Sequence, residues 1–559
     1  TERAWRFRRA TEAARRAGLE GFPVEPATPA VPSVVPPDLP YECVRFDDPT
    51  DPLADGRARI GAARIDHSVP PVPHTKGGRV AGYARWARFR DDHLKSYAAR
   101  RNDPLRPHAV SRMSAYLHHG HVSPWRLAQE ASEIGGKGVE KWLDEMLVWR
   151  ELSYAWAHHQ STDQKSLRAL PEWAQQTLEA HAQDDRSGSP SLEALERGKT
   201  GDELWDAAQL SLIRHGELHN NVRMTWGKAF LEWLPPAEAL AAALNLNHRY
   251  ALDGHDPNSL GGVLWCFGLF DRPFDPPKPR IGRVRPRPTD RHANRLDVGA
   301  FRDLCRPSPL LAGRSRPPRL LVVGAGLAGL SAARTLHDQG IEVVVIDKGR
   351  GPGGRMSARW VDLEPLQRLI LDHGANFFTV RDRTFQHRVS QWADVGVVAP
   401  WRGRIVALGE PDEAGVREID ERPHSTPYLG VPGMSALCEH LAADLPDVRF
   451  GVKLTEMTPC SGDPRSPEGW EVALAPGRPG MSEPAPIDPV DGVILTAPAP
   501  QTADLLPTAL QSLREVAERA TLEPCWTGLL VFDEPLDVPY DGAFVTSSPL
   551  AWIARQGSK

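Results

Sequence analysis

The stretch RLLVVGAGLAGLSAARTLHDQGIEVVVIDKG, residues 319–349, constrains the fold more than any other part of the chain. An apolar run leads into Gly324, Gly326 and Gly329, a helical pattern follows, and a second apolar run ends at Asp347. Glycines at this spacing let a helix N-terminus approach a pyrophosphate, and the acid suits an adenosine ribose. The pattern therefore predicts a parallel strand–helix–strand unit that opens an α/β domain over residues 319–559.

The length of the chain requires more than this one domain. A chain of 559 residues is too long for a single core, so at least two domains are expected. Charged residues make up 25% of the chain and hydrophobic residues 41%, a balance typical of soluble globular proteins. No apolar run approaches about 18 residues and no signal peptide is visible, so we expect no membrane segment and a cytoplasmic location.

Cysteine spacing and net charge exclude two further classes. Because the six cysteines form no CxxC and no metal-ligand spacing, we expect reduced thiols and no metal site: Cys43, Cys266, Cys305, Cys438, Cys460 and Cys525. The net charge is −5, so any contact with a polyanion must come from a local basic surface. From Lys278 to Arg319 the chain holds 12 Lys and Arg against 3 Asp and Glu, which suits either a solvated linker or a contact with the DNA backbone.

A second informative stretch, residues 202–267, combines helical periodicity with many aromatic and polar side chains. It interleaves four tryptophans with amides and charges: Trp205, Trp226, Trp233, Trp265, His219, Asn220, Asn221, Arg223, Asn247 and Asp253. An unpaired buried polar group costs about 1–3 kcal/mol, so these groups must be paired or must serve a ligand. A large aromatic cofactor with amide edges and a phosphate tail would satisfy them together. A tryptophan-rich helical core with surface amides is the alternative.

Four short motifs occur in a fixed order between Gly198 and Met224. They are Gly198-Lys199-Thr200-Gly201, Asp206-Ala207-Ala208, His219-Asn220 and Arg223-Met224. This order resembles the photolyase/cryptochrome family, most closely the class II cyclobutane pyrimidine dimer photolyases. The resemblance covers roughly residues 76–305 and implies an all-α, FAD-binding catalytic domain there.

The resemblance also implies which residues hold the flavin. Arg223 and Asp253 match the family's ion pair at the flavin, and Asn247 matches the asparagine that faces the reactive nitrogen, with Asn258 as the less favoured alternative. The other implied flavin contacts are Tyr97, Ser111, Arg112, Met113, Ser114 and Asn220. Without the resemblance, the serine pair would be interpreted as an ordinary helix cap.

A lesion pocket is implied around Glu145. This carboxylate resembles the one that hydrogen-bonds the damaged base pair, and Trp149 and Trp265 resemble the aromatic walls that receive a flipped-out dimer. Trp149 follows Glu145 by four residues, which predicts the same helical face. Without the resemblance, Glu145 would be a surface carboxylate paired with Lys141.

The implied activity is light-driven DNA repair. Trp226 and then Trp205 would pass electrons to the flavin, with Trp233 in reserve, and the reduced FAD would split a pyrimidine dimer in damaged DNA. A cryptochrome-like photoreceptor that repairs nothing is the second hypothesis. In a third, the C-terminal half is the active enzyme and the photolyase half is vestigial.

The segment after Asp347 indicates the cofactor of the second domain. Lys348-Gly349-Arg350-Gly351-Pro352-Gly353-Gly354-Arg355-Met356 resembles the GGR segment of amine-oxidase-like flavoproteins, in which an arginine reaches the FAD phosphates. Residues 372–378 and 428–434 resemble renalase-type oxidoreductases. We therefore expect Lys348, Gly354 and Arg355 to bind a second FAD, one in each half, beside a small dihydronicotinamide-like or amine substrate.

These patterns divide the chain into four parts. We expect residues 1–75 to be the last helix of an antenna domain and a Pro-rich connector, extended and irregular from Pro23 to about Pro73, with the antenna chromophore absent. The photolyase-like domain follows over 76–305, and a basic Pro-rich linker covers 306–318. The Rossmann-type FAD domain occupies 319–559, and we expect its closing flavin-contacting segment to lie beyond Lys559.

Overall fold

The computed structural model divides the chain into two compact units, Thr1–Ala312 and Gly313–Lys559. It describes residues 4–21, 52–72, 74–160, 163–306, 316–363, 367–413, 415, 417–421, 426–460, 462–463, 466–534 and 536–558. Most of the predicted connector, Cys43, and residues 307–315 of the predicted linker lie outside these ranges. Each unit is described by itself below. Within the described ranges no helix has the length and apolar character needed to cross a membrane.

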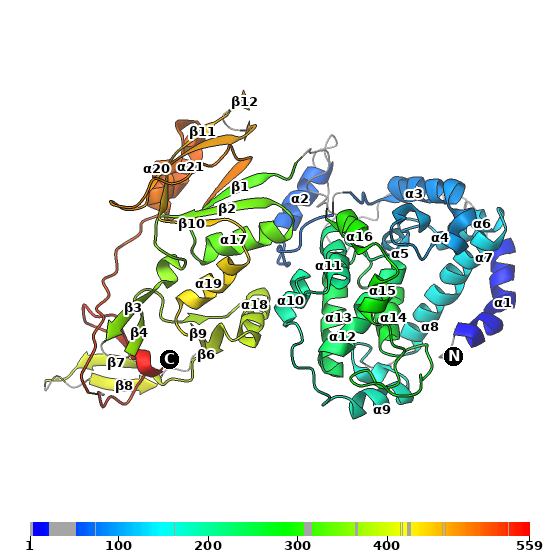
Figure 1. Cartoon of the computed structure of the whole chain (residues 1–559), viewed down its shortest axis with the longest axis horizontal. Helices are drawn as coiled ribbons and strands as arrows, with labels where there is room; N and C mark the ends of the chain where they lie inside the picture. The colour runs from blue at the N-terminus through cyan, green and yellow to red at the C-terminus, as the bar shows by residue number, and fades with distance from the viewer. Residues whose placement is uncertain are drawn as a thin grey trace, which may run out of the picture. The chain divides into compact units, whose positions relative to one another are not determined.

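Every regular element in the described part of unit 1 is a helix (Figure 1). The α-helices are α1 (Ala4–Gly21), α2 (Pro52–Ala62), α3 (Arg79–Asp92), α4 (Tyr97–Arg100), α5 (Ser114–His118), α6 (Pro124–Ser132), α7 (Lys137–Asp144), α8 (Glu151–His159), α9 (Glu172–Ala180), α10 (Leu192–Arg197), α11 (Glu203–His215), α12 (Asn220–Trp233), α13 (Pro236–Tyr250), α14 (Pro257–Cys266), α15 (Thr289–Ala293) and α16 (Val298–Cys305).

Helix α2 corrects the expectation that the whole connector is irregular. Pro52 stands at the first helical position, where its fixed φ and missing N–H are tolerated, and no further proline follows before Ala62. The prediction of irregular backbone from proline content was therefore wrong for residues 52–62.

A π-helical turn, η3 (Glu145–Arg150), joins α7 to α8. The i→i+5 hydrogen bonds of a π-helix make its turn wider than that of an α-helix, which shifts the faces of the following helix α8 relative to α7. Such turns occur mostly at functional sites, and a sequence pattern based on 3.6 residues per turn does not reveal them.

The larger core of unit 1 contains the tryptophans of the 202–267 stretch. Trp205 and Trp226 are each 1% exposed and pack with Phe230 and Phe267 where α11, α12 and α14 meet. At Gly227 an added Cβ would lie 2.6 Å from Cys266 Sγ, so α12 and α14 approach closely at this point. These helices therefore hold the indoles in a dense, dry environment.

Unit 2 combines a parallel four-stranded sheet with a mixed four-stranded sheet and smaller antiparallel sheets (Figure 1). The parallel sheet has the order β10-β2-β1-β15 and consists of β10 (Val448–Phe450), β2 (Glu342–Asp347), β1 (Arg319–Val323) and β15 (Gly492–Leu495). The other strands are β3 (Ala358–Leu363), β4 (Gln367–Asp372), β5 (Phe378–Thr379), β6 (Val398–Pro400), β7 (Ile405–Pro411), β8 (Arg417–Glu421), β9 (Pro427–Gly430), β11 (Val452–Pro459), β12 (Gly462–Asp463), β13 (Ser466–Pro467), β14 (Trp470–Pro476), β16 (Gly542–Val545) and β17 (Trp552–Ala554). The helices of this unit are α17 (Leu327–Asp338), α18 (Arg383–Asp394), α19 (Ser435–Ala443), α20 (Ala499–Leu505) and α21 (Gln511–Glu518).

The predicted strand–helix–strand unit is confirmed. β1 and β2 pair in parallel from Arg319 opposite Glu342, and α17 connects them. A Cβ on Gly329 would lie 1.9 Å from the Gly324 carbonyl oxygen, so only glycine allows the helix to pack this closely on the turn.

Replacing Gly138 with alanine should destabilise unit 1. The new Cβ would lie 2.2 Å from the Leu94 carbonyl oxygen and 2.4 Å from that of Lys95, and backbone atoms cannot move aside as a side chain can. We expect the free energy of unfolding to fall by about 2 kcal/mol or more. Gly262→Ala in α14 is the control, since nothing lies within 4 Å of its Cβ. Denaturant titration followed by tryptophan fluorescence measures both, and equal effects would contradict the close approach at Gly138.

Candidate functional site

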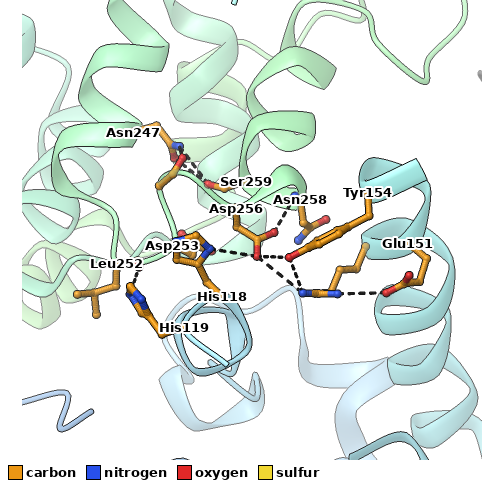
Figure 2. Close-up of polar contacts among 12 residues, drawn as sticks. His118, His119, Glu151, Tyr154, Asn247, Leu252, Asp253, Asp256, Asn258 and Ser259 are labelled. Carbon is orange, nitrogen blue, oxygen red and sulfur yellow. Dashed lines mark hydrogen bonds and ion pairs between the residues drawn. The ribbon is translucent and has the colours of Figure 1, made fainter. Parts of the chain in front are cut away.

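Four polar side chains meet where α12, α13 and α14 come together, and Figure 2 labels three of them, Asn247, Asp253 and Ser259. Asn247 is 0% exposed, and its amide nitrogen donates to Ser259 Oγ at 3.0 Å and to the Gly254 carbonyl at 3.2 Å. Arg223 donates to the same Ser259 Oγ at 3.3 Å and pairs with Asp253 at 3.5 Å. The structure therefore brings together the predicted flavin ion pair and the predicted asparagine. Ser259, which the sequence did not single out, links them.

A hydrogen-bonded network extends from this cluster along the start of α14 (Figure 2). Asp256 is 4% exposed and caps α14 by accepting from the backbone N–H of Asn258 at 2.8 Å. Its other oxygen accepts from Tyr154 Oη at 2.7 Å and lies 3.5 Å from His118 Nδ1. Burial, and to a smaller extent the hydrogen bond to Asp256, raises the pKa of the Tyr154 hydroxyl. Arg150 donates to Tyr154 Oη at 2.7 Å, so this network ties α5 and α8 to α14.

Two buried polar atoms before and at the start of α12 lack a partner among the residues that the structure describes. They are His219 Nε2 and Asn220 Oδ1. His219 Nδ1 accepts from the backbone N–H of Asn221 at 3.3 Å, and burial lowers the pKa of His219 to about 4, so the neutral ring carries its proton on Nε2. A bound group with its own donors would satisfy Asn220 Oδ1, which fits the predicted contact of this amide with a flavin.

Three tryptophans form a continuous series from the core toward the surface. The rings of Trp205 and Trp226 are nearly parallel, at 10°, with centroids 6.2 Å apart, and Trp233 lies 5.3 Å from Trp205. The indole nitrogen of Trp205 donates to the Trp226 carbonyl at 3.0 Å, and that of Trp226 donates to Gln209 Oε1 at 2.9 Å. Trp233 is partly exposed. The predicted relay residues are therefore in sequence, although Trp233 rather than Trp205 is the one nearest to solvent.

Glu145 is held by two cations of the chain itself. Its carboxylate lies 2.7 Å from Arg101 Nη2 and 2.7 Å from Lys141 Nζ. The plainer expectation, an ion pair with Lys141, is therefore present, and Arg101 is a partner that the sequence pattern missed. A base could hydrogen-bond this carboxylate only alongside or in exchange for these cations.

Trp149 and Trp265 lie in direct contact. Their rings stack with centroids 5.1 Å apart and an interplanar angle of 28°. They form one aromatic surface with no space between them for a base, so they do not stand apart as two facing walls. Local spacing did not reveal this contact, because Trp149 lies in the π-turn η3 and Trp265 lies far along the chain on α14.

The Ser111–Ser114 segment has a strained backbone and two hydroxyls that bond to no described residue. Arg112 has a φ of 53°, unusual for a residue with a Cβ, and its guanidinium pairs with Glu217. Met113 is 2% exposed and belongs to the second core cluster with Tyr97, so its side chain is not available to a ligand. Tyr97 is covered by Arg101, whose guanidinium carbon lies 5.5 Å from the ring centre.

The GKTG motif serves to position α11. Asp206 accepts from Thr200 N–H at 2.9 Å, from the Thr200 hydroxyl at 2.7 Å and from Gly201 N–H at 3.1 Å. Asp202 caps the helix by accepting from the Trp205 N–H at 3.0 Å. The motif therefore fixes the start of the helix that carries Trp205.

A cleft of about 670 Å³ opens beside α12 in unit 1. It is lined by polar and basic residues that the site prediction did not include, among them Asn102, Asp103, Asn221, Arg287, Arg291, His292 and Arg295. Arg223, Asn247 and Asp253 line neither this cleft nor the one in unit 2. The only sequence signal for this cleft was the basic composition after Lys278.

The cleft of unit 2 surrounds the glycine turn. It measures about 1790 Å³, and its lining includes all seven predicted cofactor residues: Gly324, Gly326, Gly329, Asp347, Lys348, Gly354 and Arg355. Asp347 accepts from the backbone N–H groups of Ala325 at 2.7 Å and Gly349 at 2.6 Å, which fixes its carboxylate at the end of β2. A Cβ on Gly326 would meet nothing closer than the Gly353 carbonyl at 3.8 Å, so this glycine leaves room that a pyrophosphate can use.

Three curated proteins named deoxyribodipyrimidine photo-lyase are similar to the chain. The one from Methanothermobacter thermautotrophicus is 43% identical over 198 residues, covering 35% of this chain and 44% of that protein. The one from Oryza sativa subsp. japonica is 39% identical over 258 residues, covering 44% and 50%. The one from Arabidopsis thaliana is 37% identical over 244 residues, covering 42% and 48%.

In the other half, residues 322–392 match the family described as an NAD(P)-binding Rossmann-like domain. The chain spans about half the length of the curated photolyases it matches. The comparisons therefore support the resemblance of the N-terminal half to deoxyribodipyrimidine photo-lyases and, in the C-terminal half, a Rossmann-like unit over residues 322–392.

Proposed function

We propose that unit 1 binds FAD and uses light to repair cyclobutane pyrimidine dimers in DNA. The observation that carries the proposal is the series Trp226, Trp205 and Trp233, which starts three residues after Arg223 on α12. A series of packed indoles from α11 and α12, beside Arg223 on α12, is suited to electron transfer. The homologous photolyases support the same activity.

The residues of the chain fit a flavin in unit 1 in three respects. Asn220 Oδ1 is buried and lacks a partner among the described residues, the hydroxyls of Ser111 and Ser114 bond to no described residue, and Arg223 with Asp253 offers a charged pair. Asn247 Oδ1 has one long contact, to Ser259 Oγ at 3.4 Å, so it can still accept a hydrogen bond. Bound FAD would supply light absorption and the transferred electron.

The three relay tryptophans differ in whether the indole N–H can lose its proton once the ring is oxidised. Oxidised tryptophan becomes acidic at its indole N–H, but the N–H groups of Trp226 and Trp205 are held by buried amide oxygens, Gln209 Oε1 and the Trp226 carbonyl, away from bulk water. Trp226 and Trp205 therefore keep their protons while the electron vacancy moves outward. Trp233, partly exposed, can release its proton to water, which would make the charge separation long-lived.

A photoreceptor without repair is the second candidate, and two observations favour it. Glu145 is neutralised by Arg101 and Lys141, and Trp149 and Trp265 stack without a gap. Repair requires that this pocket accept a flipped-out dimer against the aromatic surface, whereas signalling requires only the flavin and the relay.

Trp226→Phe should slow photoreduction of the flavin-loaded protein by about tenfold or more, because phenylalanine is not oxidised by an excited flavin. Trp142→Phe is the matched control, since Trp142 is also buried but belongs to the other core cluster. Absorbance at the flavin bands under blue light measures the rate. Equal rates in Trp226→Phe and parent would contradict the electron route.

The repair assay uses a dimer-bearing oligonucleotide and chemically reduced protein. We expect dimers to disappear under near-UV or blue light and to persist in the dark, and Trp226→Phe should repair as well as the parent because the reductant replaces the relay. Intact dimers after illumination, with normal photoreduction, would favour the photoreceptor instead.

For unit 2 we propose a second FAD and oxidation of a small dihydronicotinamide-like or amine substrate. The glycine turn, Asp347 and the cations Lys348 and Arg355 would hold the cofactor, with the phosphates at the start of α17.

Gly326→Val tests this second site, because Gly326 lines the cleft and a Cβ there meets nothing closer than 3.8 Å, so a larger side chain would take room from the cofactor. We expect the flavin content to fall from two per chain to one while photoreduction in unit 1 persists. Gly557→Val, at an exposed glycine that does not line the cleft and has nothing within 4 Å, should retain both. Acid release of the flavin and its absorbance give the ratio, and an unchanged ratio in Gly326→Val would remove the second site.

A further inference from the structure

The cleft beside α12 contains a guanidinium with no acidic partner. Arg287 is half-buried and donates to Thr225 Oγ1 at 2.7 Å and to the Asn221 carbonyl at 3.0 Å, both of them neutral acceptors. No carboxylate of the described residues pairs with it, and burial lowers its pKa, although a guanidinium stays charged at neutral pH. A partly buried charge without a counterion is costly, so this site favours an anion.

Two further cations line the same cleft. Arg291 and Arg295 are exposed, and their side chains have no hydrogen-bond or ion-pair partner in the described part of the chain. Asp103 is the acid among the lining residues, and Arg106 already binds it at 3.0 Å. The lining therefore has an excess of positive charge.

His292 adds a donor without adding charge. Its Nδ1 accepts from Thr225 Oγ1 at 2.7 Å, and burial, together with Arg287 and Arg295, lowers its pKa, so the ring is neutral with its proton on Nε2. Arg287 and His292 are thus both fixed through Thr225, whereas Arg291 and Arg295 can adjust. Fixed donors beside adjustable cations are suited to a tetrahedral anion.

Three other cations of the basic segment are paired with carboxylates. Arg285 pairs with Asp271 at 2.8 Å, Arg283 with Asp275 at 2.8 Å, and Arg319 with Glu342 at 2.6 Å. The three cleft arginines, by contrast, have no carboxylate partner among the described residues.

We propose that this cleft holds phosphates of the DNA backbone beside the lesion site, with Arg287, Arg291 and Arg295 as the binding residues. The inference rests on the proposed repair function. Two of the lining residues adjoin residues of the proposed site in the sequence: Asn221 follows Asn220, and Asn102 follows Arg101, which binds Glu145. Phosphodiester oxygens bind arginine well, and the contact is independent of sequence and of damage.

The test measures DNA binding by the full chain in the dark at several salt concentrations. The variant Arg291→Gln/Arg295→Gln should bind DNA about tenfold or more weakly than the parent at 0.1 M salt. The loss should be the same for undamaged and dimer-bearing duplexes. The slope of log K against log salt should become shallower by about 1 to 2. The control Arg9→Gln/Arg88→Gln makes the same charge change at exposed arginines that do not line the cleft, and it should keep the parent slope.

Several outcomes would overturn the inference. An unchanged slope in the cleft variant, or the same loss in the control, would show that the cleft arginines do not bind the backbone. Loss of inorganic phosphate binding by calorimetry with normal DNA binding would assign the cleft to a free phosphate ligand. If the parent binds DNA with the expected slope but repairs nothing under light, the repair function fails while this contact stands.

Discussion

The hydrogen bond from the Trp205 indole to the Trp226 carbonyl sets the geometry on which the rest of unit 1 depends. It joins α11 to α12 inside the core and holds the two rings nearly parallel. Asp202 and Asp206 fix the start of α11, and Gly227 lets α14 approach α12 closely. A relay needs constant distances between its members, and dense packing around these helices provides them.

Helix α12 connects the separate parts of the proposed mechanism. From its start to its end it presents Asn220 for the flavin, Arg223 for the ion pair, Thr225 for the anion cleft, Trp226 for the relay and Trp233 at its last turn. Light absorption, electron supply and binding of the DNA backbone would therefore share one rigid helix. Changes along this helix are expected to couple these functions even where they do not touch the same ligand.

Features of the fold that depend on local pattern could be predicted from the sequence. The glycine turn with Asp347 specified the strand–helix–strand unit because each glycine meets a steric demand within that unit. The ion pair of Arg223 and Asp253 and the pairing of Trp205 with Trp226 followed from a family motif.

What the sequence did not reveal depends on contacts between distant segments. The π-turn at Glu145–Arg150 breaks the 3.6-residue period, and the stacking of Trp149 on Trp265 joins two helices more than a hundred residues apart. The basic segment gave a charge count but could not say that Arg285 is paired and Arg287 is not. Helix α2 shows the same limit at short range: it forms in a region whose proline content predicted irregular backbone.

The most direct measurement is nanosecond transient absorption of the flavin-loaded protein after a blue flash. The account predicts that a tryptophan radical forms promptly, and that Trp233→Phe, which leaves Trp226 and Trp205 in place, still forms a radical but slows its loss of a proton. A flash that produces no tryptophan radical in protein with a full complement of flavin would contradict the claim that light on this unit moves an electron through its indoles.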